Sequence, residues 1–334
     1  MAYQMVTRTG RSFWEVTSAM QNAIRKGNYE VAGYCVWEML PEYTPYLRKR
    51  FLVISAEDCF GVLTKDILPL CETGTEESLT KALSLLCMAK KNRDADYFVC
   101  NLMLGDNPTG ADKDTLAKEL FDAIRTRDVV KAGVYCREFF KKNRKALWKM
   151  LLDMAKMYYP HLEPEFIALN QANERMTKPT EETIYVAKAI VLMWTCREPK
   201  EDIFAYPAMR FDDVLGMADI PVPKPVEQCR QIKGLFPEWA YNWHTYHGKY
   251  KLGRDVVHAI SNDQQILTPL EENLFDDCTW NHDINICLLK HNPNRYSLPY
   301  DDGKMKPGEK FKPVEIDGPK EDITRPGQMT LDFQ

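Results

Sequence analysis

Apolar residues near the start of the chain recur at the spacing of a helix. One apolar face runs up to Ile24, and Gly27 followed by Asn28 is typical of a helix end in the left-handed conformation. A second apolar face begins at Ala32 with the spacing i, i+3, i+4, i+7 and i+8, and Pro41 ends it. The pattern predicts two amphipathic helices joined by a short turn.

The same pattern returns one hundred residues further along the chain. The segment AIRKGNYEVAGYCVWEML (23–40) corresponds without a gap to AIRTRDVVKAGVYCREFF (123–140). Identical residues recur at an offset of 100 from Ala23, Ile24, Arg25, Ala32, Gly33, Glu38, Leu47, Lys49 and Leu52. TEESLTKALSLLCM (75–88) is echoed by TEETIYVAKAIVLMWTC (180–196) at a slightly larger offset, as a loop insertion would cause. Helical periodicity alone would not repeat an arginine, a glycine and a glutamate, so we expect an all-α fold made of two tandem copies of one helical module.

The chain divides into four predicted parts. Residues 1–110 and 111–204 are the two helical repeats. Residues 205–294 are an irregular C-terminal extension, which starts in a Pro- and Asp-rich connector and continues with aromatic and histidine-rich segments. Residues 295–334 are rich in Pro, Gly, Lys, Glu and Asp, so this tail buries too little apolar surface to offset its ordering entropy and is predicted to be flexible and disordered.

The composition is that of a globular protein without a strong net charge. Of the 334 residues, 45% are hydrophobic, and the net charge of −4 gives no overall attraction to nucleic acid or anionic membranes. No stretch resembles a signal peptide, and no uncharged apolar run reaches the roughly 18 residues of a membrane span. The ten cysteines form no CxxC pair, which is typical of a reducing compartment. We expect a cytoplasmic protein without membrane contact.

Two segments of the first repeat carry a family resemblance. SAMQNAIRKGNYEVAGYCVWEML (18–40) and TPYLRKRFLVISAEDCFG (44–61) resemble the C-terminal helical region of the RarA/MgsA family of clamp-loader-like, recombination-associated AAA+ ATPases. The matching residues are Ser18, Ala19, Ala23, Ile24, Arg25, Ala32, Tyr34, Arg50, Leu52, Ile54, Ser55, Ala56, Glu57, Asp58 and Gly61, with Ser55 and Ala56 in swapped order. KALSLLCMAKKNRDADY (81–97) is similar to a later helix and turn of the family. The resemblance implies a collar-like helical module that works in replication or recombination.

The ATPase module of that family is not found in this sequence. There is no GxxxxGK[ST] loop to hold a triphosphate, and no GxSxG or HExxH pattern, so we expect no cofactor and no enzymatic activity. The adjacent Glu57 and Asp58 should point to different sides of a helix, which favours a capping or interchain ion-pair role over catalysis. Met157 and Tyr158 take their places in the second repeat, where the resemblance is weak.

The final residues, QMTLDFQ, are similar to the peptide with which polymerases and clamp loaders bind the bacterial β sliding clamp. Leu331 and Phe333 can fill an apolar cleft while the Gln328 amide forms hydrogen bonds at its rim, and Met329 adds an adaptable contact. Asp332 lies between the two apolar anchors. A flexible tail would present this peptide in the extended form that it needs. The alternative is that Leu331 and Phe333 dock the tail onto the protein's own surface.

Two basic segments are candidates for a weak contact with DNA. Basic and aromatic residues alternate in them, and this combination can hold phosphates and stack bases. The candidate residues are Lys141, Lys142 and Arg144 in KKNRKALWK, and Lys249, Lys251 and Arg254 in HTYHGKYKLGRD. The alternative, which the acidic total favours, is that both segments are ordinary solvated faces.

Histidines and cysteines crowd into the C-terminal extension. The set comprises His244, His247, His258, Cys278, His282 and Cys287. Their spacing matches no zinc signature, so we predict no metal. A metal-dependent nucleic-acid enzyme centred on 244–287 is kept as a third hypothesis.

The leading hypothesis is a non-enzymatic accessory protein of DNA replication or recombination. Its C-terminal motif would bind the sliding clamp, and its helical scaffold would serve for homo-oligomeric assembly or for contact with a replicative polymerase or a RarA-like ATPase. Several tails in one oligomer would add avidity. The alternative is a helical interaction protein of a phage or other mobile element that mimics or sequesters a RarA-like or clamp-loader ATPase.

Overall fold

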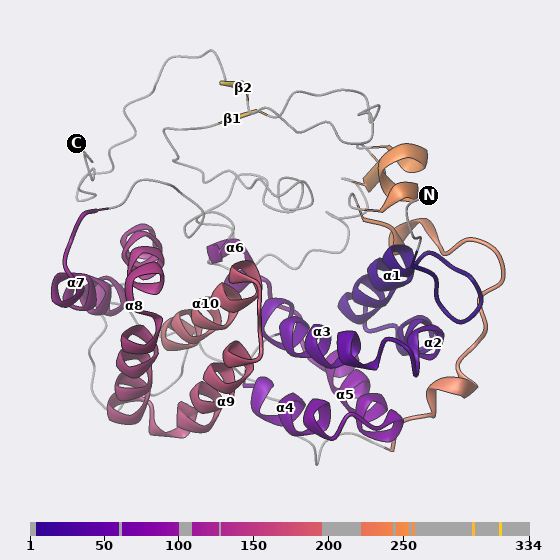
Figure 1. Cartoon of the computed structure of the whole chain (residues 1–334), viewed down its shortest axis with the longest axis horizontal. Coiled ribbons are helices and arrows are strands. Elements are labelled where there is room, and N and C mark those ends of the chain that lie inside the picture. Colours follow the sequence, from indigo (N-terminus) through magenta and orange to yellow (C-terminus); the bar gives the residue numbers. More distant parts are fainter. Residues whose placement is uncertain are drawn as a thin grey trace.

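The computed structural model describes residues 5–59, 62–99, 109–126, 128–195, 222–242, 245–253 and 256–257, and the backbone of 296–297 and 314–315. The described chain is mainly helical, which confirms the all-α class (Figure 1). The first helices are α1 (Phe13–Arg25), α2 (Tyr29–Met39), α3 (Thr44–Glu57), α4 (Thr64–Thr73), α5 (Glu76–Met88) and α6 (Asp94–Phe98). They are followed by α7 (Lys113–Thr126), α8 (Val129–Tyr158), η2 (Pro160–Leu162), α9 (Glu163–Glu174) and α10 (Pro179–Thr195). The short elements η4 (Val226–Gln228), η5 (Glu238–Ala240), η6 (Gly248–Leu252), β1 (Tyr296–Ser297) and β2 (Val314–Glu315) come last. None of the described helices combines the length and the apolar character that crossing a bilayer requires.

The turn between α1 and α2 has the predicted left-handed helix end. Gly27 has a positive φ of 67°, which a glycine adopts without strain. The side chain of Asn28 then caps α2 by accepting a hydrogen bond from the N–H of Val31 (3.1 Å). One hundred residues later, Asp128 caps α8 in the same way through the N–H of Lys131 (3.0 Å).

Glu38 and Glu138 bind the segments that precede α1 and α7. The Glu38 carboxylate accepts hydrogen bonds from the backbone N–H and the hydroxyl of Thr9 (3.1 and 2.6 Å). The Glu138 carboxylate accepts the same two bonds from Thr109. The glycine that follows each threonine has a positive φ, of 84° and 72°. The threonines and glycines are thus further identical pairs at the offset of 100, and the two threonines make equivalent contacts.

The single helix α8 corresponds in sequence position to both α2 and α3. Between α2 and α3 lies Pro41, which has no backbone N–H to continue a helix. In the corresponding place α8 continues through Lys141 and is only kinked at Asn143, whose φ of −157° and ψ of 79° are not helical. The Asn143 side chain accepts a hydrogen bond from the N–H of Ala146 (3.0 Å), as the cap of a new helix would.

The helices form two groups that lie side by side in Figure 1. In the first group α1 packs on α2, α3 on α4 and α4 on α5, and in the second α7 packs on α8, α8 on α9 and α9 on α10. The groups meet where α4 packs on α9 and where α10 packs on α3 and α6. One hydrophobic cluster runs through both groups, so they share a core.

A buried glutamate and a buried lysine lie where the groups meet. The Glu165 carboxylate of α9 accepts hydrogen bonds from the backbone N–H groups of Thr64 and Lys65 at the start of α4 (3.1 and 2.8 Å). The Lys188 ammonium of α10 donates to the carbonyl of Cys59 (2.5 Å). Burial raises the pKa of Glu165 to about 6 and lowers the pKa of Lys188. A residue of the second group therefore caps a helix of the first.

The raised pKa of Glu165 predicts a pH dependence of stability. A carboxyl whose pKa is higher in the folded protein contributes stability that is complete below its unfolded value of 4.5 and is lost as the pH rises through about 6. A shift of this size corresponds to about 2 kcal/mol. From about pH 4 to pH 7, the free energy of unfolding of the wild type in urea should fall by about 2 kcal/mol relative to that of Glu165→Gln. A difference between the two proteins that stays constant over this range would contradict the prediction.

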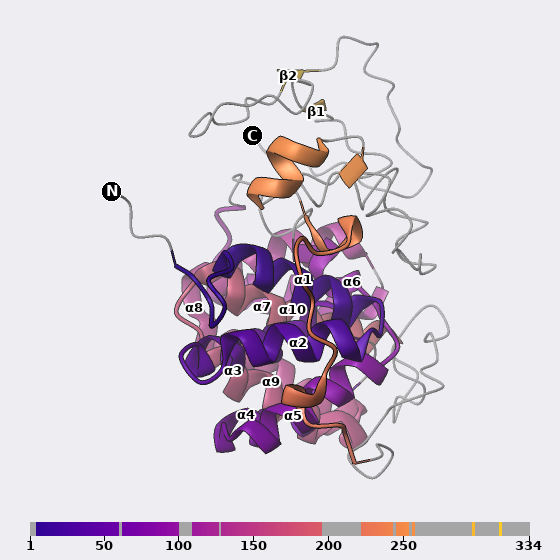
Figure 2. The same cartoon turned by 90° about the vertical axis from the view of Figure 1, so that its right-hand side faces the viewer.

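Residues 222–242, which we call the strap, lie across α1 and α2 (Figure 2). The Arg11 guanidinium donates to two strap carbonyls (2.5 and 2.7 Å), and the Ser18 hydroxyl donates to a third (2.9 Å). A Cβ atom at Gly33 would come within 2.4 Å of Cys229 Sγ, so α2 presents a bare backbone where the strap touches it. This part of the predicted extension is therefore a cover for the first group of helices.

The predicted flexible tail lies largely outside the described residues. Within it, β1 and β2 pair antiparallel, with Tyr296 opposite Glu315 and Ser297 opposite Val314. The prediction of a flexible tail over 295–334 stays a prediction. Composition could not show this pairing, because it depends on two short segments of ordinary β propensity that are distant in sequence.

Candidate interaction site

A network of charged side chains fills the space between α1 and α3. Asp58, which follows the last residue of α3, is buried and pairs with Arg25 of α1 (2.9 Å) and with Arg93 (3.6 Å). Its neighbour Glu57 pairs with Arg50 and with Arg25, both at 3.4 Å. Buried charges need such partners, because water no longer solvates them. The network consequently joins α1 to α3 and to the segment that leads into α6.

Gln21 connects the two carboxylates of this network. Its amide group donates to Glu57 (3.2 Å) and to Asp58 (3.0 Å), and its carbonyl oxygen accepts a hydrogen bond from Arg50. Burial alone would raise the pKa of Asp58, but the two arginine charges beside it hold that pKa below its usual range. For Glu57 burial outweighs the nearby positive charge, and its pKa is raised.

The prediction that Glu57 and Asp58 point to different sides of a helix is wrong. Helix α3 ends at Glu57, and Asp58 has a φ of −117°, so the chain leaves the helix between the two residues. Both carboxylates then reach Arg25, and the ion pairs form within this chain. Since arginines occupy both carboxylates, the pair is suited to holding helices together and not to general acid–base chemistry.

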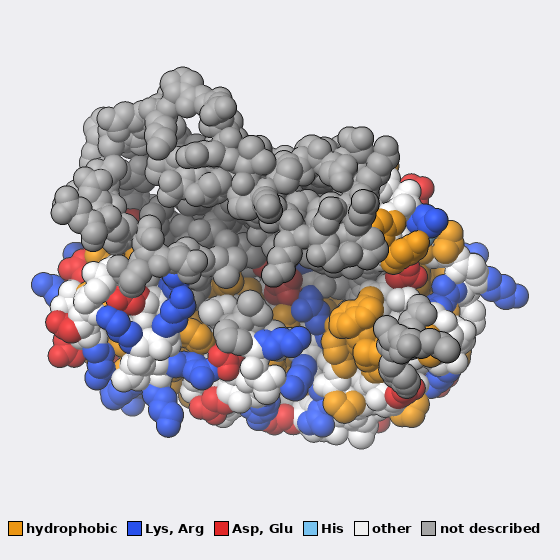
Figure 3. All heavy atoms as spheres, turned by 45° about the horizontal axis from the view of Figure 1, so that its top comes forward, with side chains coloured by type: hydrophobic (Ala, Val, Ile, Leu, Met, Phe, Trp, Pro, Cys, Tyr) orange, Lys and Arg blue, Asp and Glu red, His pale blue; other side chains and the backbone are white. Residues whose placement is uncertain are grey.

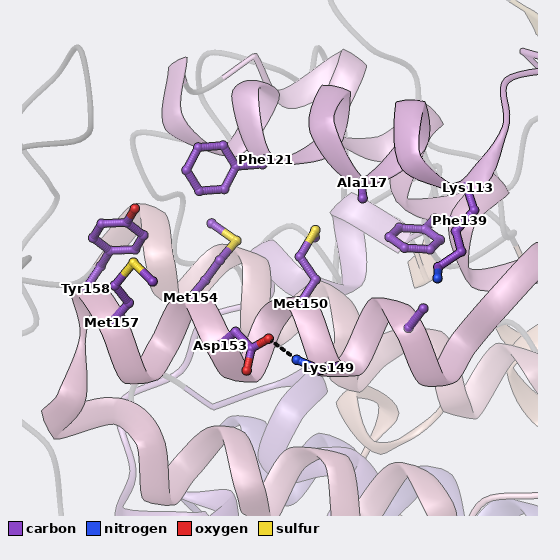
Figure 4. A pocket seen from close by; sticks show the side chains of 11 residues that line it. Lys113, Ala117, Phe121, Phe139, Lys149, Met150, Asp153, Met154, Met157 and Tyr158 are labelled. Atoms are coloured by element: carbon purple, nitrogen blue, oxygen red, sulfur yellow. Dashed lines mark hydrogen bonds and ion pairs between the residues drawn. The ribbon is translucent and has the colours of Figure 1, made fainter.

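The corresponding place in the second group is an apolar groove between α7 and α8. The positions of Gln21, Arg50, Glu57 and Asp58 are taken there by Phe121, Met150, Met157 and Tyr158. Figure 4 shows Phe121 of α7 opposite Met150 and Met154 of α8. The groove has a volume of about 310 Å³. The groove was not predicted from the sequence, although the change from Arg50 and Glu57 to methionines at the offset of 100 indicates it.

Smaller or more flexible side chains leave the groove open. In the first group, the ring of Phe13 is buried against the ring of Tyr46, with 4.9 Å between their centroids. Lys113 and Ala146 occupy the corresponding positions and line the groove. The two aromatic rings that fill the first group are therefore missing from the second.

The first predicted DNA-contact segment lies at the kink of α8. Lys141, Lys142 and Arg144 are exposed there, but Lys142 pairs with a glutamate of the same helix (2.8 Å) and Arg144 pairs with Glu182 of α10. Figure 3 shows Lys and Arg side chains gathered at the lower left, the side on which α7 and α8 lie in Figure 1. This segment is a basic surface next to the groove.

The second predicted DNA-contact segment lies elsewhere. Lys249 and Lys251 are in η6, at the opposite end of the molecule from α8 in Figure 1. Lys249 lies over the ring of Tyr250 (5.4 Å), and Arg254 is outside the described residues. The structure thus does not bring the two basic segments onto one surface.

The other candidate residues are only partly described. His247 stacks on Tyr241, with 4.1 Å between ring centroids, and no cluster of three potential metal ligands occurs among the described residues. His244, His258, Cys278, His282 and Cys287 lie outside those residues, as do Gln328, Met329, Leu331, Asp332 and Phe333 of the C-terminal motif. The metal and clamp-binding predictions therefore stay predictions.

Comparison with known proteins places the chain in no family. No protein-family model, no curated protein and no solved structure matches it.

Proposed function

We propose that this protein is a non-enzymatic adaptor that links a helical scaffold to the DNA sliding clamp in replication or recombination. The observation that carries the proposal is the terminal QMTLDF sequence, in which Leu331 and Phe333 are spaced to fill an apolar cleft and Gln328 to bind its rim. The helical body then determines what is brought to the clamp.

The scaffold itself is proposed to be a duplicated, collar-like module. Equivalent caps at Asn28 and Asp128, and equivalent bonds from Thr9 and Thr109 to their glutamates, support a duplication. The network between α1 and α3 supports the likeness to the RarA/MgsA collar. Four residues that carry the likeness, Arg25, Arg50, Glu57 and Asp58, contact one another there.

A cytoplasmic setting is also part of the proposal. The described cysteines, Cys35, Cys59, Cys71, Cys87, Cys136 and Cys229, are all buried and free. Burial raises the pKa of the Cys59 thiol to about 11, so it is protonated and unreactive at neutral pH. Such cysteines act as small core residues and fit a reducing compartment.

Removing the C-terminal motif should abolish binding to the clamp. We expect the full chain to bind purified bacterial β clamp in surface plasmon resonance, and the double variant Leu331→Ala/Phe333→Ala to bind at least about tenfold more weakly, because both apolar anchors are lost. A chain truncated after Gly327 should bind no better than the double variant. The matched control is Ile323→Ala, which removes an apolar tail residue outside the motif and should keep the wild-type affinity. Equal binding by the full and truncated chains would refute the clamp proposal.

The collar likeness also supports a second candidate, a protein that enters or blocks the assembly of a RarA-like ATPase. Such a protein should co-purify with that ATPase without any clamp present. The double variant Asp58→Ala/Glu57→Ala would alter this interaction only by disturbing the fold. Truncation of the tail is therefore the change that distinguishes the two candidates. Retention of ATPase binding after truncation at Gly327, together with absence of clamp binding by the full chain, would favour this candidate over the first.

A further inference from the structure

We propose that the groove between α7 and α8 is a docking site for an acidic segment with apolar side chains, supplied by a partner protein. The inference goes beyond the clamp proposal and does not depend on it, because it uses only the groove and the charges around it. The clamp would be bound by the tail, and the groove would take a different protein.

The lining of the groove favours apolar side chains of varied shape. Met150, Met154 and Met157 project from successive turns of α8, and Phe121 faces them from α7 (Figure 4). Methionine is flexible and polarisable, so methionine-lined surfaces adapt to different apolar partners. Met157 is 56% exposed although it is apolar, and Tyr158 lies beside Phe121 with 6.3 Å between ring centroids. A volume of about 310 Å³ has room for a few side chains of a partner segment.

The charge around the groove selects an acidic partner. Residues 141–158 of α8 carry six basic side chains, Lys141, Lys142, Arg144, Lys145, Lys149 and Lys156, against the single acidic Asp153. Asp153 is already paired with Lys149 in the groove wall. Helix α7 carries equal numbers of basic and acidic residues. Lys142 and Arg144 pair with Glu138 and Glu182, but Lys141, Lys145 and Lys156 remain exposed, so the α8 side of the groove keeps a net positive charge. Carboxylates that flank apolar anchors would meet positive charge on α8, which speeds association and excludes basic segments.

An apolar groove fits a peptide better than DNA. Phosphates bind to hydrogen-bond donors and positive charges, whereas the lining of the groove is mainly apolar and its only positive charges are those of Lys113 and Lys149. Transfer of apolar side chains from water into such a groove is favourable. The observations therefore favour a protein segment, and DNA binding is one of the outcomes to be tested.

The first group of helices shows what the second has lost. There the rings of Phe13 and Tyr46 fill the space. Gln21 forms its hydrogen bonds with the carboxylates of the charged network, so these polar groups have partners within the chain. At the same positions the second group has a lysine, an alanine and a phenylalanine that face open space. A side chain from outside can replace the missing aromatic rings.

The test uses the full chain and a fluorescein-labelled helical peptide with Leu, Phe and Leu at positions i, i+3 and i+7 and glutamate at the exposed positions. We expect this peptide to bind about tenfold or more tightly than a charge-reversed peptide with lysines in place of the glutamates, as measured by fluorescence anisotropy. A peptide with serines in place of the apolar residues should bind as weakly as the charge-reversed one.

Two variants place the binding in the groove. Lys113→Phe/Ala146→Tyr restores the residues of the first group and should fill the groove, and Met157→Glu adds a negative charge at an exposed position of its wall. Each should weaken peptide binding by about tenfold or more. Lys118→Phe is the matched control, because it removes the same charge from the same helix outside the groove, and it should bind like the wild type. Thermal melting checks that the variants are folded.

Three results would overturn the proposal. They are equal binding of the acidic and charge-reversed peptides, unchanged binding by both groove variants, and displacement of the peptide by duplex DNA in a way that depends on Lys141, Lys142 and Arg144 alone. The chain truncated after Gly327 separates this proposal from the clamp proposal. It should bind the peptide like the full chain, whereas stronger peptide binding after truncation would show that the protein's own tail occupies the groove.

Discussion

Asp58→Ala should lower the free energy of unfolding by about 3–5 kcal/mol, because it removes the central carboxylate of a buried network. Arg25 and Arg93 would lose the partner that lies 2.9 and 3.6 Å away, and Gln21 would lose one of its acceptors. The positive charges of two largely buried guanidinium groups would then lose part of the negative charge that balances them. Most of the lost stability comes from these unbalanced charges. Urea unfolding followed by circular dichroism measures the change.

The matched control for Asp58→Ala is Asp153→Ala. Asp153 also pairs with a basic residue, Lys149, but both side chains are well exposed, so its loss should change the free energy of unfolding by no more than about 0.5 kcal/mol. A similar cost for both substitutions would show that the network between α1 and α3 does not hold the fold together.

Glu38→Ala should cost about 3 kcal/mol of stability, more than Glu138→Ala at the equivalent position, which we expect to cost about 1–2 kcal/mol. The Glu38 side chain is fully buried and accepts hydrogen bonds from Thr7, Thr9 and Tyr34, whose donors would be left without a partner. Glu138 forms an ion pair with Lys142, whose side chain is 43% exposed. Water can therefore solvate the Lys142 ammonium when the carboxylate is removed. Equal costs at the two positions would contradict this ranking.

The cost of Glu38→Ala should also depend on pH. Burial alone would raise the pKa of Glu38, but hydrogen bonds from Thr9, Tyr34 and Thr7 hold it below 4.5. A carboxyl with a lowered folded pKa contributes stability above its unfolded value and loses it as the pH falls through the folded value. The difference between wild type and Glu38→Ala should therefore be full at neutral pH and shrink in acid. Glu38→Gln, which keeps one acceptor oxygen, should lie between the two proteins at neutral pH.

The local signals in the sequence predicted the helices well. The apolar spacing, the Gly27–Asn28 pair and Pro41 place α1 and the ends of α2 close to their observed positions, because these features depend on a few neighbouring residues. The kink at Asn143 was not predicted, since it depends on a cap within an otherwise continuous helical pattern. Periodicity also could not show that α1–α5 and α7–α10 would share one core.

Contacts between distant segments account for most of what the sequence did not reveal. Arg11 binds carbonyls more than two hundred residues away, and no local pattern marks an arginine for that role. The expectation that Glu57 and Asp58 point to different sides of a helix failed because α3 ends at Glu57, and a helix end is hard to place to the residue from sequence. The groove could be found in the sequence only by comparing positions at the offset of 100, where Met150 and Met157 stand in place of Arg50 and Glu57.

The contacts of the strap determine how the protein behaves after proteolytic cleavage. Its peptide carbonyls accept hydrogen bonds from Arg11 and Ser18, and its Phe236 and Tyr241 are buried against the first group of helices. A protease cut between α10 and residue 222 would therefore produce two pieces that remain associated. Gel filtration would report an intact molecule, and only a denaturing gel would reveal the nick. The two pieces could also be produced separately and recombined, which would make the protein a candidate for fragment complementation.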